Sequence, residues 1–275
     1  MRPTVDREAG APRPARGNDV IQADRIAAIL VALEEQGSSS IAGLAERFAV
    51  SEETIRRDVR QLEGAGRVLK VHGGVTLPSP RLEAPYRRRL RDQVEAKRAI
   101  ARLAAAFVEE GSTVFVDSGT TSYWAAQELG HLRGLTLVTN SLEVASEALG
   151  RGDHRVFLAG GAMNADYRSA FDADAIGFVR RFVPDVAILS MAAIEAERGF
   201  LDLDPAEAAF KRAVLDRARR LVVVADHGKF LRQGTVHVAD FGEVHDLVTD
   251  RAPPPHIGDA ARAGGTALHL VTPAA

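Results

Sequence analysis

Residues 50–64 read VSEETIRRDVRQLEG, and this stretch decides the fold of the N-terminal part of the chain. Ser51 is a natural N-cap, and the two glutamates after it place negative charge where the helix dipole favours it. Ile55, Val59 and Leu62 lie on one narrow stripe of the predicted helix. The opposite face and its flanks carry polar side chains: Thr54, Arg56, Arg57, Arg60 and Gln61. We therefore expect one side to pack inward while the other offers guanidinium groups and a hydroxyl.

Two shorter helices are predicted before this one. Apolar residues recur at helical spacing over residues 26–33, and again over residues 41–48 after serines that can cap a helix. Only two residues separate the second helix from Ser51, so the connection is a tight turn. Residues 67–75 then alternate and break at a glycine pair, as a β-hairpin would. This order predicts a winged helix-turn-helix, although an ordinary three-helix bundle with a solvated charged face has the same periodicity.

The composition limits the classes of protein to consider. A hydrophobic share of 46% and a charged share of 26% are typical of a soluble globular protein. The net charge is −2, so any affinity for DNA has to come from a local basic patch. The absence of cysteine excludes disulfides and thiolate sites. No apolar run approaches the roughly 18 residues that span a membrane, and no signal-peptide core is present. We expect no membrane partner and a cytoplasmic location.

The chain is expected to divide into four parts. Residues 1–18, with arginines among proline, glycine and alanine, are predicted to form a disordered tail. Residues 19–76 are expected to form the helix-turn-helix domain, residues 77–94 a linker interrupted by prolines, and residues 95–273 a second domain. The arginine run at residues 87–91 is a second DNA contact or, as we prefer, a solvated helical face.

Short β-rich runs alternate with helical segments through the second domain. The runs lie at residues 113–116, 135–138, 155–158, 186–189 and 221–224 and suit strands covered on both faces. Such alternation predicts an α/β fold with a mostly parallel sheet and helices on both sides. Polar and glycine clusters follow the runs, and open α/β sheets bind ligands at the carboxyl ends of their strands. The sequence therefore predicts a small polar ligand.

The clearest of these clusters is Asp117-Ser118-Gly119-Thr120-Thr121. Such a strand-to-helix junction aims backbone N–H groups and hydroxyls at an anion, although a single run of this kind is more often only a capped helix start. Similar residues follow the other strands: Thr139 and Asn140, Gly160 and Gly161, and Lys229. Glu207 and Lys211 stand four apart on one helix and are expected to pair with each other. The histidines show no metal-ligand spacing, and we expect neither a metal nor a cofactor.

The ordered run from Leu44 through Thr54-Ile55-Arg56-Arg57-Asp58 to His72-Gly73-Gly74-Val75 resembles the signature of DeoR-type bacterial transcriptional regulators. The resemblance implies a winged helix-turn-helix joined to a sugar-phosphate-isomerase-like sensor domain. It also implies a DNA-binding regulator, usually a repressor, here of carbohydrate-metabolism genes, with a double-stranded DNA operator and a phosphorylated sugar as partners.

Site residues follow from the motifs and the resemblance together. The expected DNA contacts are Ser51, Thr54, Arg56, Arg57, Arg60, Lys70 and His72, with Arg57 the first choice for a base edge in the major groove. The expected effector contacts are Asp117, Ser118, Gly119, Thr120, Thr121, Thr139, Asn140, Gly160, Gly161 and Lys229. One short helix reads few bases, so a homodimer or homotetramer is expected.

Two stretches depart from the family pattern. Asp172 and Asp174 stand where a glycine is expected, and Ala192-Ala193-Ile194 lacks a glycine before the isoleucine. Both stretches fall where sugar hydroxyls should bind, so the resemblance is firmer for the phosphate than for the sugar. The two aspartates either bond hydroxyls or, as we prefer, begin a helix.

Two other functions fit parts of the sequence. One is a sugar-phosphate isomerase-like enzyme with an accessory DNA-binding head, which needs a positioned acid/base pair. Asp117, Asp172, Glu207 and His227 are available for that role, but no pair has a compelling spacing. The other is a DNA-binding scaffold whose α/β domain only forms oligomers. The sequence favours the regulator and predicts no enzyme.

Overall fold

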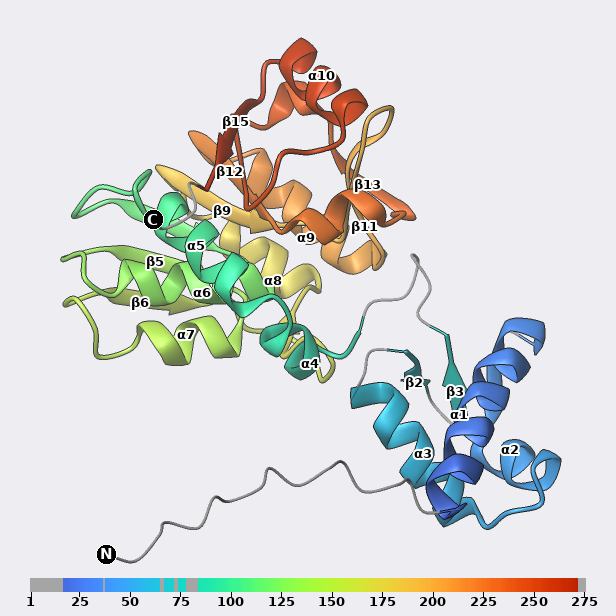
Figure 1. Cartoon of the computed structure of the whole chain (residues 1–275). Coiled ribbons are helices and arrows are strands. Elements are labelled where there is room, and N and C mark those ends of the chain that lie inside the picture. Colours follow the sequence, from blue (N-terminus) through green and yellow to red (C-terminus); the bar gives the residue numbers. More distant parts are fainter. Residues whose placement is uncertain (1–16, 37, 65–66, 72–73, 78–83, 272–275) are drawn as a thin grey trace, which may run out of the picture. The chain divides into compact units, whose positions relative to one another are not determined.

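The computed structural model describes residues 17–36, 38–64, 67–71, 74–77 and 84–271 (Figure 1). The chain divides into two compact units, Met1–Ser79 and Pro80–Ala275. Most of the expected tail lies outside the described residues, as does His72.

The first unit is a three-helix domain with a small antiparallel sheet. Its elements are α1 (Gly17–Gln36), β1 (Ser38–Ser40), α2 (Ile41–Arg47), α3 (Glu52–Gly64), β2 (Leu69–Val71) and β3 (Gly74–Thr76). The predicted stripe of Ile55, Val59 and Leu62 is buried in a core shared with α1 and α2. Ser40 caps α2 by accepting a hydrogen bond from the backbone N–H of Gly43 at 2.9 Å. The predicted three helices and hairpin are confirmed.

The strand β1 has no counterpart in the prediction, because three consecutive serines show no apolar alternation. The strand pairs antiparallel with β3, which gives the sheet the order β1-β3-β2. Gly74 lies opposite Ser40, and a Cβ at Gly74 would lie 2.6 Å from the Ser39 carbonyl oxygen. No larger residue fits there, so the hairpin is tied closely to the segment between α1 and α2.

The second unit is built on a seven-stranded parallel sheet with the order β15-β14-β12-β9-β4-β5-β6. The strands are β4 (Thr113–Val116), β5 (Thr136–Thr139), β6 (Arg155–Leu158), β9 (Val186–Ser190), β12 (Arg220–Ala225), β14 (Asp246–Thr249) and β15 (Ala267–Leu270). Helices cover both faces (Figure 1): α5 (Val94–Ala105), α6 (Thr120–Leu129) and α7 (Leu142–Ala148) on one, α8 (Ala173–Val179), α9 (Pro205–Leu215) and α10 (Pro255–Gly264) on the other. The predicted α/β fold with a parallel sheet is confirmed.

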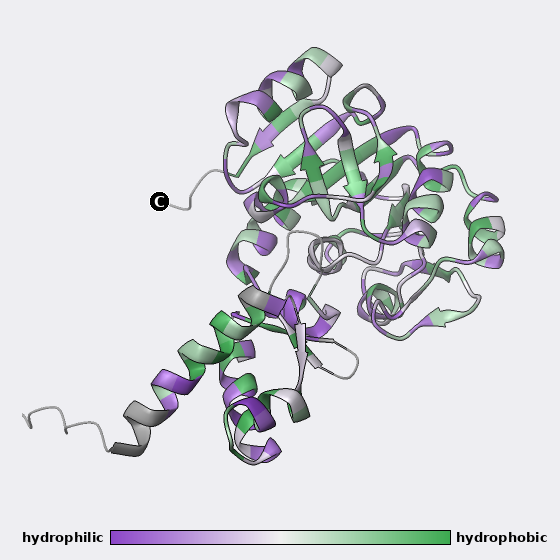
Figure 2. Ribbon diagram, turned by 90° about the vertical axis from the view of Figure 1, so that its right-hand side faces the viewer, coloured by the Kyte–Doolittle hydropathy of each residue, from purple (hydrophilic) through white to green (hydrophobic). Residues whose placement is uncertain are grey.

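The strands explain why the sheet is covered on both sides. Val114 and Val116 of β4 pack with the α5–α7 layer, whereas Phe115 between them packs against Phe210 of α9, with ring centroids 6.0 Å apart. Hydrophobic residues dominate the central strands (Figure 2).

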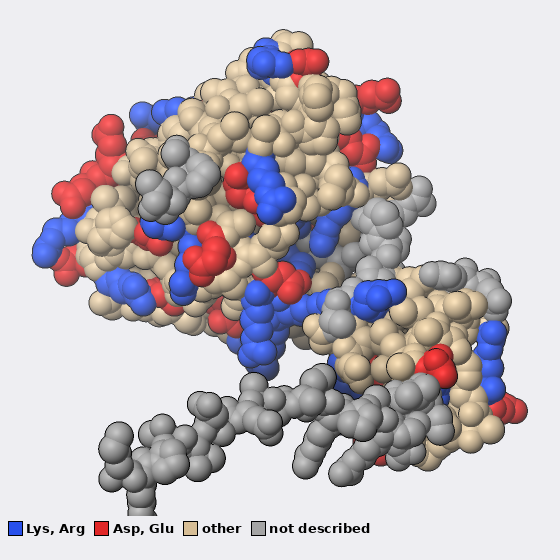
Figure 3. Space-filling view, viewed as in Figure 1, with Lys and Arg blue, Asp and Glu red and all other residues tan. Residues whose placement is uncertain are grey.

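Basic and acidic side chains are interspersed over the visible face of the unit (Figure 3). On this face the charges are therefore mixed and not of one sign.

The strand order contains a switch point beside β4. From β4 the chain proceeds to β5 and β6 on one side, and it later returns to β9 on the other side of β4. Connections diverge at the carboxyl ends of these two strands, which is where open α/β sheets bind their ligands. The loop Asp117–Gly119 and the end of β9 at Ser190 meet at this point.

Several elements of the structure were not predicted from the sequence. They are a second sheet of β10 (Ala193–Glu195), β11 (Gly199–Asp202) and β13 (Val236–Ala239), the hairpin of β7 (Met163–Asn164) and β8 (Ser169–Ala170), the 3-10 helices η1 (His227–Leu231) and η2 (Phe241–Glu243), and the strands β14 and β15. The stretch expected as a linker, residues 77–94, includes the helix α4 (Tyr86–Arg91), whose Tyr86 is buried. A buried aromatic residue joins this helix to the second unit and explains the difference.

Candidate functional site

Arg57 projects from the solvent-facing side of α3. It is exposed, and no hydrogen bond or ion pair joins it to any residue that the structure describes. The arginines beside it are paired, because Arg56 lies 2.6 Å from Glu52 and Arg60 lies 2.6 Å from Glu53. The helix therefore presents Arg57 ready for contact, whereas Arg56 and Arg60 would have to exchange a glutamate for a phosphate.

The other predicted DNA contacts surround α3. The ammonium of Lys70 on β2 lies 2.6 Å from Glu63. Ser51 Oγ accepts a hydrogen bond from the Thr54 backbone N–H at 3.2 Å and lies 2.9 Å from the Thr54 hydroxyl. A groove of about 530 Å³, lined in part by Lys70 and the two paired arginines, runs between α3 and the sheet. Lys70 thus shares the groove with Arg56 and Arg60, whereas Ser51 and Thr54 do not line it, and His72 lies outside the described residues.

Asp58 belongs to the same helix but faces the core. Its fully buried carboxylate accepts hydrogen bonds from Arg25 Nε at 2.6 Å and from Gln22 Nε2 at 2.9 Å, both on α1. A buried carboxylate without such partners would be strongly destabilising. The charge of Asp58 is therefore balanced inside the domain, where it fixes α3 to α1.

In the second unit, Asp117 organises the switch point. Its buried carboxylate accepts hydrogen bonds from the Gly119 backbone N–H at 3.0 Å and from the Ser190 backbone N–H at 2.8 Å. The Ser190 hydroxyl also donates to it, at 3.1 Å. A Cβ on Gly119 would lie 1.6 Å from the Ser190 hydroxyl oxygen, so only glycine fits. Asp117 and Gly119 therefore position the start of α6 rather than line the open space.

A buried cluster of charges adjoins Asp117. The ammonium of Lys211 lies 2.7 Å from Glu207, 2.9 Å from Asp202 and 3.6 Å from Asp117. Burial alone would lower the pKa of Lys211, but the three carboxylates outweigh burial and raise that pKa well above its ordinary value. Lys211 therefore stays charged and holds together β11, α9 and the loop after β4. The expected pairing of Glu207 with Lys211 is confirmed, although deep in the fold.

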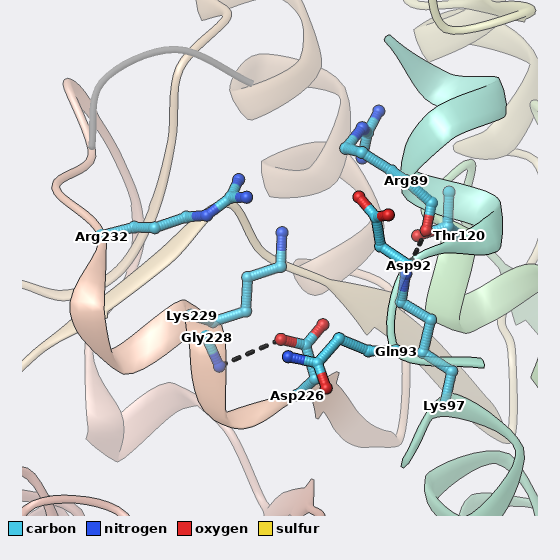
Figure 4. Close-up of a pocket in the computed structure, with 9 residues that line it drawn as sticks. All are labelled: Arg89, Asp92, Gln93, Lys97, Thr120, Asp226, Gly228, Lys229 and Arg232. Atoms are coloured by element: carbon cyan, nitrogen blue, oxygen red, sulfur yellow. Dashed lines mark hydrogen bonds between the residues drawn. The ribbon is translucent and has the colours of Figure 1, made fainter. Parts of the chain in front are cut away.

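The open space lies beside this cluster. A cavity of about 380 Å³ is lined by Arg89, Asp92, Gln93, Lys97, Thr120, Asp226, Gly228, Lys229 and Arg232 (Figure 4). A narrower recess shares Arg89, Thr120 and Lys229 with it and reaches Thr121, Ser190 and the Lys211 cluster. The ten-residue helix α6 begins at the shared wall, and the N-terminus of a helix favours anions.

The cavity carries an excess of positive charge. Four of its side chains are basic and two are acidic. Lys97 is almost fully buried, and its ammonium donates a hydrogen bond to the Arg89 carbonyl. Burial lowers the pKa of Lys97 to about 8, with Lys229 and Arg89 acting in the same direction and Asp226 opposing them. An anion would relieve this repulsion, so the cavity suits a phosphate-sized group.

The structure separates the predicted effector residues into three groups. Thr120, Thr121 and Lys229 line the cavity or its recess. Asp117, Ser118 and Gly119 form the buried loop that carries α6, and the Ser118 hydroxyl has no hydrogen-bond partner among the described residues. The remaining four line neither space: Thr139, Asn140, Gly160 and Gly161.

Three of those four residues, Thr139, Asn140 and Gly161, serve local structure. Thr139 Oγ1 accepts a hydrogen bond from the Ser141 backbone N–H at 3.0 Å, and the Asn140 side chain donates to the Ala170 carbonyl at 3.0 Å. Gly161 has a φ of 134° and packs against Asp172, which caps α8 by accepting from the Ala175 N–H. Backbone hydrogen bonds from Ala162 and Ala175 lower the pKa of Asp172. The preferred interpretation of Asp172 as a helix-start acid is confirmed.

Sequence reasoning missed most of the cavity wall. Arg89 lies in the run expected to be a solvated face or a second DNA contact, yet its side chain lines the cavity. Lys97, Asp226 and Arg232 were not among the expected contacts. Two sequence features together could have identified these residues: the basic residues near residue 90 and the strand-end segment at residues 226–232.

Comparison with known proteins decides the family. A model described as the DeoR C terminal sensor domain matches residues 92–251, and one described as a DeoR-like helix-turn-helix domain matches residues 25–81. The chain belongs to the DeoR family. It is therefore a DNA-binding transcriptional regulator with a sensor domain and not an enzyme, so the isomerase-like alternative is set aside.

Relatives within the family are similar over most of their length. The glycerol-3-phosphate regulon repressor of Escherichia coli (strain K12) is 36% identical over 85% of this chain and 92% of its own. The transcriptional repressor AccR of Agrobacterium fabrum is 34% identical over 82% of this chain and 89% of its own. Among solved structures, ribose 5-phosphate isomerase A from Methanocaldococcus jannaschii aligns over 50% of this chain and 55% of its own, with 16% identity and a TM-score of 0.38. That likeness is too slight to carry a functional argument.

Two further properties complete the description of this DeoR-family chain. No helix in the described part is long and apolar enough to cross a bilayer. Within the same residues, no group of three or more His, Asp or Glu side chains is arranged to hold a metal ion.

Proposed function

We propose that this DeoR-family regulator represses carbohydrate-metabolism genes and that a phosphorylated sugar or polyol in the cavity modulates its operator binding. The observation that carries the proposal is the cavity of about 380 Å³, with four basic side chains at the start of α6. The names of the relatives support it, since one is a glycerol-3-phosphate regulon repressor and another a transcriptional repressor.

Within the cavity, the phosphate is placed among Arg89, Lys97, Lys229 and Arg232. The sugar hydroxyls then extend along Thr120 toward the recess, which is lined by the hydroxyls of Thr121 and Ser190 and by the carboxylates that pair with Lys211. This orientation places the negatively charged phosphate beside basic side chains and the sugar hydroxyls beside polar groups.

On the DNA side, Arg57 is proposed to read a base edge, because it is the guanidinium of α3 with no described partner. Arg56, Arg60 and Lys70 are proposed to bind phosphates after leaving their glutamates. One short helix reads few bases, and binding to paired half-sites would raise the sequence specificity. We therefore propose a homodimer or homotetramer. We also propose that the protein acts in the cytoplasm.

Effector and operator are proposed to be coupled by a population shift. Coupling free energies of this kind are typically about 1–3 kcal/mol and are reciprocal, so DNA must change effector affinity by the same factor. Effector binding then favours an arrangement in which the paired DNA-binding domains no longer match the half-sites.

The test is fluorescence anisotropy on DNA from the region upstream of the protein's own gene, at fixed salt, with a panel of sugar phosphates. We expect one compound to change the Kd for DNA by about 5- to 150-fold. Lys229→Gln should weaken the response, whereas Arg133→Gln removes the same charge at an exposed position outside the cavity and should not. An unchanged Kd at saturating concentrations of every compound would contradict the sensor role.

A further inference from the structure

The helix α3 carries acidic side chains among the basic ones that are proposed to bind DNA. It contains four acidic and three basic residues and is therefore net negative. One of the acids, Asp58, is buried and balanced by Arg25. The other three, Glu52, Glu53 and Glu63, are at least partly exposed. Surfaces that bind nucleic acid are usually basic, and exposed glutamates on such a surface oppose binding.

Each exposed glutamate of α3 is paired with a basic side chain on the groove between α3 and the small sheet. Three ion pairs of 2.6 Å result: Glu52 with Arg56, Glu53 with Arg60, and Glu63 with Lys70 of β2. Glu53 also lies 3.8 Å from Arg56. Every basic side chain that the structure places on the groove belongs to one of these pairs. The groups available to bind phosphates along this groove are thus already bound to carboxylates.

A DNA phosphate and a glutamate compete for the same donors. Guanidinium and ammonium groups form charge-assisted hydrogen bonds with carboxylate and phosphate oxygens alike, so a phosphate contact has to separate the ion pair. The glutamate that is released stays beside the DNA, where the negative phosphates repel it. Both effects lower the affinity for DNA of any sequence, and three pairs act together.

We propose that the three paired glutamates of α3 are built-in competitors of the DNA phosphates and that they weaken sequence-independent binding. Stable binding then depends on the base contact of Arg57, which lies outside the three pairs, and on a second half-site. The inference rests on the proposed function, because it takes the paired basic residues as phosphate contacts.

Competition by the glutamates affects the salt dependence of binding as well as the affinity. The logarithm of the binding constant falls with the logarithm of the salt concentration, with a slope of about −0.9 for each phosphate that is neutralised, because condensed cations leave the DNA. A glutamate released next to the DNA keeps negative charge there, so fewer cations leave. Replacing the glutamate by neutral glutamine should therefore raise the affinity and steepen the slope.

The test uses the full chain and a duplex of random sequence. Glu63→Gln is the main variant, because Glu63 lies in the last turn of α3, where the helix dipole does not favour a negative charge. Glu53→Gln is the second variant. Asp24→Asn is the matched control, since it removes one negative charge at an exposed position of α1 that does not line the groove. Fluorescence anisotropy between about 50 and 200 mM salt gives the affinity and the slope, and denaturant unfolding checks that each variant is folded.

Each glutamine variant is expected to lower the Kd by about two- to fivefold, as the strength of exposed ion pairs allows, and to steepen the slope by up to about 0.9. Asp24→Asn should change the affinity less and leave the slope as in the wild type. A folded Glu63→Gln that behaves like Asp24→Asn overturns the inference. Lys70→Gln then separates the two failures: weaker binding by this variant leaves the proposed phosphate contact standing, whereas unchanged binding overturns that contact as well.

Discussion

Replacing Arg57 by alanine is expected to abolish sequence preference while leaving nonspecific DNA binding. Because Arg57 pairs with no residue that the structure describes, its removal leaves none of the described side chains without a partner. The measured loss is therefore that of the DNA contact alone. A bidentate arginine–guanine contact discriminates by about 1–3 kcal/mol, which corresponds to about 5- to 150-fold in Kd for each half-site.

Fluorescence anisotropy with an operator duplex and a scrambled duplex, at two salt concentrations, separates base reading from phosphate binding. Arg57→Lys is the matched control, because it keeps the charge but loses the planar fork of donors. We expect Arg57→Lys to bind the scrambled duplex as the wild type does and to lose preference for the operator. Equal weakening on both duplexes by Arg57→Ala would refute base reading and leave only a phosphate contact.

Three further outcomes follow from the sensor domain. Because the pKa of Lys97 is about 8, binding of a doubly charged phosphate above that pH has to be accompanied by protonation of the Lys97 amine. Effector affinity should be close to its maximum near pH 7, where Lys97 is about nine-tenths protonated, and should fall about twofold by pH 8 and about fivefold further by pH 9 in calorimetry. Lys97→Arg should flatten the profile. Lys211→Met leaves three buried carboxylates without their counter-charge and should lower the free energy of unfolding by about 3–5 kcal/mol, as denaturant unfolding would show. Gly119→Ala should weaken effector binding in calorimetry through its clash with Ser190, and adding Ser190→Gly should restore part of that affinity.

The DNA-binding domain was predictable because its information is local. Helical spacing, the serine caps and the basic face of α3 all lie within a few residues of one another, and the structure reproduces them. The exceptions depend on distant partners. Asp58 looks like one more exposed charge until Arg25, 33 residues away, is brought beside it. β1 forms only because Gly74 lets its backbone approach β3.

The cavity was predictable only in part, for a related reason. Strand ends are visible in the sequence, which is why Thr120 and Lys229 were found. The order of the strands in the sheet cannot be read from the sequence. Thr139 and Gly161 therefore looked as suitable for the cavity as Thr120 and Lys229, although β5 and β6 lie to one side of the switch point. Arg89 reaches the cavity only through the packing of α4, and no pattern within its own segment shows that packing.

The buried pair of Arg25 and Asp58 has a consequence for exchanging specificity between regulators of this kind. A graft of residues 52–64 into a relative carries Asp58 with it but leaves Arg25 behind on α1. Unless the recipient supplies a matching cation, the chimera buries an unpaired carboxylate beneath the transplanted helix. The transferable module is therefore α3 together with the partner positions on α1, and α3 alone is expected to yield a poorly folded hybrid.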